Sequence, residues 1–299
     1  MHTLEIPGET IIHQVPSCLE ELNEAQFICF VDLLLKYQAG EITMEEFKTS
    51  FVVKLADIHY TLAYFLLTRR QKDKVNSEIY RLSILVDSFF TDEIRDQKPV
   101  SVLNLDFIKQ FIPIILKKYH GPQSGLQNCT FCEYRMAYSY FKSYINTEQE
   151  DDLNHLIAVL YRPQRKLFWL RKRLPGFDGQ QRTLFTAKSN PRFLEVRAKQ
   201  IGKLPMSVRY GIFLFFSGCN DYMSTGEIEI EGNKIDLSLL YKNSSSDKQD
   251  PGIGLVGLLY SLAETKVFGS IDETDNQNIY DIMIRLFQVM KQFEAMRTK

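Results

Sequence analysis

The stretch from residue 23 to residue 55, NEAQFICFVDLLLKYQAGEITMEEFKTSFVVKL, decides the fold class. Two capping-box patterns, Asn23 with Gln26 and Thr43 with Glu46, open its two halves, and such pairs satisfy the free amides at a helix N-terminus. Behind each pattern, apolar residues recur every three or four positions, which is the period of one helix face. These residues are Phe27, Phe30, Val31, Leu34 and Leu35 in the first half and Phe47, Phe51, Val52 and Leu55 in the second. Gly40 lies between the halves, so the stretch predicts a helical hairpin.

The same helical period extends along most of the chain. It predicts further helices over 58–68, 77–90, 104–119 with a kink at Pro113, 131–145, 149–161, 253–266 and 277–296. Thr147 with Glu150 is a third capping-box pattern. The apolar face of the last helix predicts that it docks on the core or binds a partner. The fold class is therefore expected to be mainly α, a multi-helix, bundle-like domain with a small β element in the C-terminal half.

Strict alternation of apolar and polar residues predicts a β-hairpin over 227–239, with its turn at Gly232-Asn233. Shorter strands are predicted over 182–187 and 192–196, between glycines and prolines. We expect a helical domain over 1–161. Residues 162–299 then hold a basic linker region, the β-hairpin and the C-terminal helices, either as a separate part or packed with the first as one unit.

The composition, with 44% hydrophobic and 24% charged residues, is typical of a globular protein and not of a disordered one. No apolar run approaches the roughly 20 residues that span a bilayer. The first twenty residues lack the basic start and apolar core of a secretory signal. Five scattered cysteines fit a reducing compartment better than a disulfide framework. We therefore expect a cytoplasmic protein without a membrane partner.

Charge is distributed unevenly along a chain whose net charge is only −1. Residues 160–209 carry 13 Lys and Arg against 2 Asp and Glu, whereas residues 1–159 carry 15 against 22. The densest part, residues 162–173, is called the basic segment here. Its candidate partner-binding residues are Arg162, Arg165, Lys166, Trp169, Arg171, Lys172 and Arg173. Concentrated positive charge favours an anionic partner. We favour an acidic protein surface, which includes the chain's own acidic helices, over nucleic acid, on whose bases Trp169 would stack.

No recognised catalytic signature, such as a lysine-containing P-loop, G-x-S-x-G or H-E-x-x-H, occurs in the sequence. Cys129 and Cys132 form a C-x-x-C pattern, but a closed zinc site needs two further ligands. His120, His155 and Cys219 follow no zinc-site spacing. We therefore expect buried structural cysteines, no catalytic residue, no metal and no cofactor. An enzyme or metal protein with a site around Cys129 and Cys132 is kept as an alternative.

Three blocks of the sequence resemble uncharacterised helical proteins of phage and prophage tail modules. The blocks are Glu24–Phe27 with Leu33–Thr43, Asp152–Pro163 and Gly257–Gly269. The resemblance implies a tail-associated virion component or a tail-assembly chaperone that binds other protein subunits, copies of itself included. We therefore expect a non-enzymatic phage-type tail structural or assembly protein, located in the host cytoplasm or incorporated into a virion. A nucleic-acid-binding module that uses residues 162–173 is the first alternative.

Overall fold

The computed structural model describes residues 1–5, 12–58, 62–95, 98–175, 177, 179–186, 188–225, 227–230, 233–236 and 254–297. The chain divides into two compact units. The first comprises Met1–Phe107 with Pro205–Gly211, and the second comprises Ile108–Leu204 with Ile212–Lys299. The expected boundary between residues 161 and 162 lies inside the second unit. Both units consist mainly of helices with small antiparallel sheets, as the sequence predicted.

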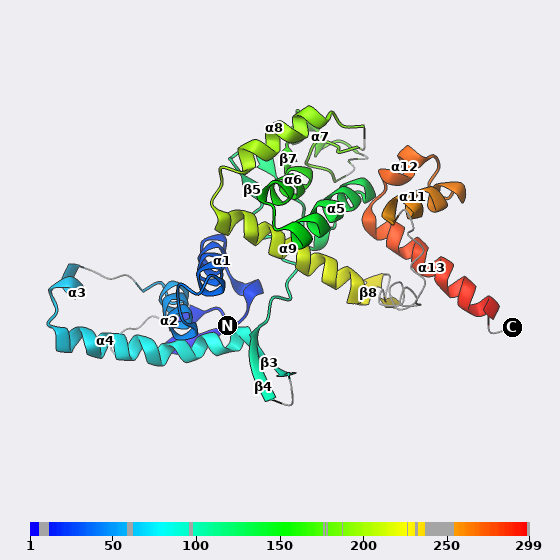
Figure 1. Cartoon of the computed structure of the whole chain (residues 1–299). Helices are drawn as coiled ribbons and strands as arrows, with labels where there is room; N and C mark the ends of the chain where they lie inside the picture. The colour runs from blue at the N-terminus through cyan, green and yellow to red at the C-terminus, as the bar shows by residue number, and fades with distance from the viewer. Residues whose placement is uncertain are drawn as a thin grey trace. The chain divides into compact units, whose positions relative to one another are not determined.

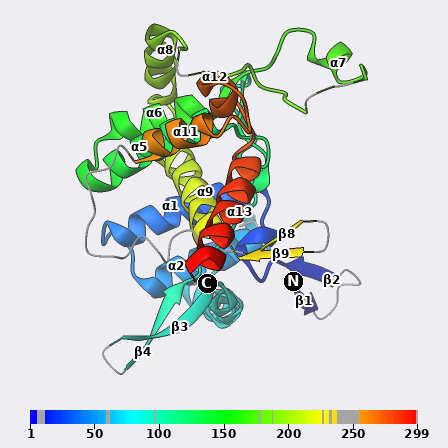
Figure 2. The same cartoon turned by 90° about the vertical axis from the view of Figure 1, so that its right-hand side faces the viewer.

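The first unit combines a helical hairpin, which Figure 1 shows as α1 and α2, with two β-hairpins, β1–β2 and β3–β4, both of which are labelled in Figure 2. Its elements are β1 (His2–Glu5), β2 (Ile12–Val15), α1 (Glu24–Gln38), α2 (Met44–Leu55), α3 (Leu62–Leu66), α4 (Arg69–Leu82), β3 (Phe90–Arg95) and β4 (Lys98–Leu103). Strand β1 pairs antiparallel with β2, and β3 with β4. Both predicted capping boxes form, Asn23 with Gln26 and Thr43 with Glu46, and the predicted hairpin of α1 and α2 is confirmed.

An aromatic cluster forms the core of the first unit. Phe30, Phe47, Phe51 and Phe89 are each 2% exposed or less. The ring of Phe51 lies 5.3 Å from that of Phe30 and 5.3 Å from that of Phe89, measured between centroids. The helix predicted over 77–90 is instead the end of α4 followed by a 3-10 helix, Ser83–Phe89. Phe89 stands at the end of that 3-10 helix, so the tighter turn leads directly into the cluster.

The second unit is a group of helices with two small sheets. Its elements are β5 (Ile114–Ile115), β6 (Tyr119–His120), α5 (Phe131–Thr147), α6 (Glu150–Leu160), β7 (Arg162–Pro163), α7 (Phe168–Arg171), α8 (Pro191–Ile201), α9 (Met206–Thr225), β8 (Glu227–Ile230), β9 (Asn233–Asp236), α11 (Leu255–Glu264), α12 (Ile271–Asp275) and α13 (Ile279–Arg297). The first six residues of α9 belong to the first unit. One sheet has the order β5-β6-β7, and β8 pairs with β9 in a hairpin, as predicted. The predicted turn position is wrong, because Asn233 begins β9 and pairs with Ile230. Residues 231–232 and 237–239 of that prediction lie outside the described residues.

Helix α6 occupies the centre of the second unit, where it packs against α5 and α8. Leu153, Leu156 and Ile157 of α6 are fully buried. On α13, Ile279 and Ile282 are 1% and 0% exposed, so the start of the C-terminal amphipathic face docks on the core. Thr147 ends α5 and does not cap α6, whose N-cap is Gln149, so the third predicted capping box is absent.

The helix predicted over 104–119 does not form. Pro113 lacks the amide that a helix interior needs, and its carbonyl accepts a hydrogen bond from Gly121 N at 2.9 Å. Leu116 and Lys117 have φ values of 49° and 58°, which turn the chain from β5 into β6. The apolar residues of this stretch repeat with a helical period, but their side chains reach the core from an extended chain. Phe111, Ile112 and Ile115 are all buried.

The two short strands predicted over 182–187 and 192–196 are also wrong. In the described part of the first segment, the β pairing is limited to an isolated bridge between Arg182 and Gln164. The second segment lies inside α8, because Asn190 caps the helix and Pro191 occupies its first turn. Within the described residues, no helix is long and apolar enough to cross a membrane.

Candidate functional site

The basic segment begins with β7 and continues into an excursion of the second unit that leads from β7 to α8. Two hydrogen bonds pair the stems of this excursion: Arg165 N donates to Gln181 O, and Thr183 N donates to Pro163 O, both at 2.9 Å. Between the stems, α7 is one short turn that begins after Leu167, whose φ is 55°. Figure 2 shows α7 on this excursion, away from α5 and α6. The stems therefore hold a projecting stretch, residues 166–174, which we call the arm.

Most of the predicted partner-binding residues are exposed on the arm. They are Lys166, Arg171, Lys172, Arg173 and Trp169, whose side chain is 64% exposed. Within the part of the chain that the structure describes, none of the four cationic side chains has a hydrogen-bond or ion-pair partner. Three leucines of the arm, Leu167, Leu170 and Leu174, are 60%, 43% and 55% exposed. The arm therefore offers cationic and apolar groups on the same short stretch.

The structure removes Arg162 from this surface. Arg162 is 1% exposed, and its Nη2 donates a hydrogen bond to Oε1 of Glu133. The prediction that Arg162 contacts a partner together with the arm is wrong, because a guanidinium sequestered in the core cannot reach that surface. Arg165 is half-buried, and its Nε donates to the backbone oxygen of Arg182 at 3.0 Å. Arg165 thus belongs to the stem that carries the arm.

Glu133, on the first turn of α5, ties both stems to the core. It is 1% exposed, and its two oxygens accept hydrogen bonds from Arg162 and from Nη2 of Arg182, the latter at 2.9 Å. Arg182 also donates to the carbonyl oxygens of Leu160 at 2.6 Å and Asn128 at 2.9 Å. Arg162 begins one stem and Arg182 lies in the other. One buried carboxylate therefore anchors the base of the arm.

This cluster of Glu133, Arg162 and Arg182 holds two guanidinium groups for one carboxylate, which leaves an excess positive charge in the interior. The pKa of Arg162 is lowered to about 10, chiefly by burial; Glu133 opposes this shift, and the charge of Arg182 adds to it. For Arg182, burial also lowers the pKa, but Glu133 and Cys129 outweigh it, so the net shift is upward. Arg182 has several acceptors. In the described structure, Nε and Nη1 of Arg162 have no hydrogen-bond partner, and of the Arg182 nitrogens Nε has none.

The C-x-x-C pair lies beside this cluster. Cys129 and Cys132 are fully buried, as predicted, and burial raises the pKa of each thiol to about 12. Both thiols are therefore protonated at neutral pH and are poor nucleophiles. Among the described residues, no group of three or more His, Cys, Asp or Glu side chains could hold a metal ion.

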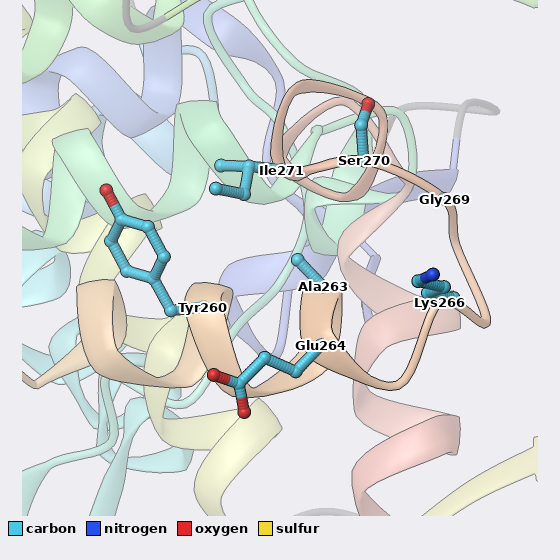
Figure 3. A pocket seen from close by; sticks show the side chains of 7 residues that line it. All are labelled: Tyr260, Ala263, Glu264, Lys266, Gly269, Ser270 and Ile271. Carbon is cyan, nitrogen blue, oxygen red and sulfur yellow. The ribbon is translucent and has the colours of Figure 1, made fainter.

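A hollow of about 600 Å³ lies between α11 and α12 (Figure 3). Tyr260 and Ile271 face it and are 51% and 42% exposed. The carboxylate of Glu264 points away from Ile271 and Ser270 in this view. The polar groups that line the hollow do not converge on one point. The hollow therefore offers apolar contact without the oriented polar groups that fix a ligand.

Comparison with protein-family models, with curated proteins and with solved structures finds no match to this chain. Sequence reasoning missed Glu133 and Arg182 as partners of Arg162. One signal was present: Glu133 follows Phe131 and Cys132 at the start of an apolar helix face, where a lone carboxylate needs a cation.

Proposed function

We propose that the protein is a non-enzymatic binding protein whose arm, residues 166–174, holds an acidic surface of another protein subunit. One observation carries the proposal. Four cations on the arm have no partner within the described chain, while Trp169 and three leucines are exposed on the same stretch. Aromatic and arginine side chains next to apolar groups are the composition of protein-binding hot spots.

The burial of several cations favours a protein partner over nucleic acid. Of the cations in residues 160–209, Arg162, Arg182 and Arg209 are buried, so the surface is less basic than the sequence suggests. Affinity for nucleic acid depends chiefly on the number of phosphates that exposed cations neutralise. Exposed leucines add nothing to phosphate contact but contribute to a protein interface. Binding of nucleic acid by the arm is therefore the alternative outcome that the experiment below can detect.

The finer proposal, that the partner is a subunit of a phage-type tail, rests on the three sequence blocks alone. In this proposal the chain itself is a structural component or an assembly chaperone of the tail. A second copy of this chain is the simplest partner to test, because residues 1–159 carry 22 acidic residues against 15 basic ones.

The experiment uses Trp169 as its reporter, because it is the only tryptophan of the chain and lies on the arm. The mass of the purified full chain is measured by size-exclusion chromatography with light scattering, at low and high salt, together with absorbance at 260 and 280 nm and tryptophan emission. Poly-glutamate and a labelled oligonucleotide serve as acidic probes. We expect nucleic-acid-free protein whose Trp169 emission shifts to the blue on self-association or with poly-glutamate.

A matched pair of triple variants identifies the arm as the site. Arg171, Lys172 and Arg173 are changed to Glu in one variant, and Arg69, Arg70 and Lys74, exposed on α4, in the other. Both change the net charge equally and substitute two arginines and one lysine. We expect only the arm variant to lose binding. Two results would overturn the proposal: equal loss in both variants, or a monomer that ignores poly-glutamate but binds the oligonucleotide until salt displaces it.

A further inference from the structure

A cleft of about 410 Å³ lies in the second unit, separate from the arm. Its floor includes Arg162 of β7, and Arg197 of α8 lines one side. Phe185 and Phe193 contribute apolar walls, and Ser189 lies beside them at the N-terminal end of α8. Among the described residues that line this cleft there is no Asp or Glu, so its two arginines have no carboxylate in the described lining.

Arg162 is the observation that points to a ligand. Its side chain is 2% exposed, yet Nε and Nη1 have no hydrogen-bond partner in the described structure. Buried guanidinium nitrogens nearly always find an acceptor, because leaving them unpaired is costly. Glu133 neutralises only one of the two guanidinium groups that it contacts. The floor of the cleft therefore carries positive charge that the described side chains do not balance.

Arg197 adds a second cation at the same cleft. Its Nη1 donates to the carbonyl oxygen of Ala158 at 2.6 Å, which fixes the guanidinium in place. The guanidinium carbon also lies 5.8 Å from the ring centroid of Tyr119. Burial lowers the pKa of Arg197, which is the direction expected where a cation lacks a nearby anion. Arg197 is thus held by neutral partners, and its charge is available to a ligand.

The N-terminus of α8 points its positive end toward the same region. Asn190, which lines the cleft, caps this eleven-residue helix through a hydrogen bond from Arg192 N at 2.9 Å. A helix N-terminus carries about half a positive charge and favours an anion. A helix N-terminus alone does not indicate a ligand, but this one lies at the cleft that Arg162, with its unpaired nitrogens, also lines.

The rim of the cleft is apolar and exposed. Leu184, Phe193 and Val196 are 49%, 70% and 48% exposed, while Phe185 below them is 5% exposed. A cleft of this volume lies in the range of small-molecule sites, which combine apolar walls with a few oriented polar groups. A bare inorganic anion would leave these walls in contact with water.

We infer that this cleft binds a carboxylate carried by an apolar group, with the carboxylate toward Arg162 and Arg197 and the apolar group against Phe185 and Phe193. The carboxylate balances the positive charge that Arg162 and Arg197 place at the floor and side of the cleft. The apolar group covers the exposed rim. This inference is independent of the arm, since the two surfaces share no residue. Either proposal can fail alone.

Isothermal titration calorimetry of the full chain tests the inference. The probes are phenylacetate, its neutral amide phenylacetamide, acetate, and the dipeptide N-acetyl-Ala-Phe with a free carboxylate. We expect saturable binding of phenylacetate or of the dipeptide, and binding of phenylacetamide and acetate weaker by about tenfold or more, because charged hydrogen bonds and apolar contact are each needed. Tighter binding of the dipeptide assigns the site to a polypeptide end, and tighter binding of phenylacetate assigns it to a free acid.

A pair of variants on α8 supplies the control. Arg197→Gln removes the cation from the cleft, whereas Arg192→Gln removes an exposed cation of the same helix that does not line it. We expect Arg197→Gln to weaken binding about tenfold and Arg192→Gln to leave it unchanged. Circular dichroism spectra that match the wild type show that both variants are folded. Equal binding of phenylacetate and its amide, equal loss in both variants, or no saturable binding by the wild type would overturn the inference.

Discussion

Glu133→Gln is the substitution whose effect on stability follows most directly from the structure. It keeps the shape of the side chain but removes the one carboxylate that, among the described residues, contacts both Arg162 and Arg182. Two buried guanidinium groups then lack a counter-charge. Removing one partner of a buried ion pair typically costs about 3–5 kcal/mol. We expect Glu133→Gln to destabilise the second unit by about that amount.

Arg162→Met is the matched comparison within the same cluster. It removes the cation whose Nε and Nη1 have no partner and leaves Glu133 and Arg182 as a balanced pair. The loss is therefore close to that of one charge-assisted hydrogen bond, about 1.5–3 kcal/mol before any gain from the apolar replacement. In the double variant the two effects should not add, because removal of Arg162 relieves part of the excess charge.

Hydrogen exchange followed by mass spectrometry measures each unit separately. Amides of α5 and α6 report opening of the second unit, and amides of α1 and α2 report the first unit as an internal control. We expect faster exchange in α5 and α6 of Glu133→Gln and unchanged exchange in α1 and α2. The reasoning would be refuted if Glu133→Gln and Arg162→Met accelerated exchange equally, or if the double variant showed the sum of both effects.

Three further predictions concern the core, the cysteines and pH. Phe51→Ala should lower the free energy of unfolding by about 3–5 kcal/mol, because Phe51 is fully buried among aromatic rings. Hydrogen exchange should accelerate in α1 and α2 but not in α6, and unchanged protection of α1 would contradict this. Iodoacetamide at neutral pH should label exposed Cys18 in the folded protein, but should label Cys129 and Cys132 only after unfolding. Burial raises the pKa of the Cys129 and Cys132 thiols to about 12. Labelling of Cys129 at the rate of Cys18 in the folded protein would contradict this. Hydrogen bonds from the backbone and side chain of Ser270 lower the pKa of Glu273, so its contribution to α12 is fully present above the unfolded pKa, about 4.3, and is lost as pH falls through the folded pKa. A Glu273→Gln variant should therefore show a smaller loss of α12 protection on acidification, and an identical loss would argue against the capping box as its source.

The sequence by itself determined the elements whose signals are local. The α1–α2 hairpin was predictable because a capping box needs only residues three apart, and the apolar stripe of each helix needs only its own period. The β8–β9 hairpin was predictable from alternation around a short turn. The burial of Cys129 and Cys132 followed from residue type.

Tertiary structure decided what depends on partners distant in the chain. The apolar residues of 104–119 have a helical period, yet they reach the core from an extended chain because Pro113 and the pairing of β5 with β6 favour it. The basic run from Arg162 to Arg173 looks uniform in sequence. Glu133, 29 residues away, draws Arg162 into the core and leaves the arm outside. Which cation meets a carboxylate is a matter of the folded geometry, because the energy of a buried ion pair depends on distance and dielectric surroundings and not on separation along the chain.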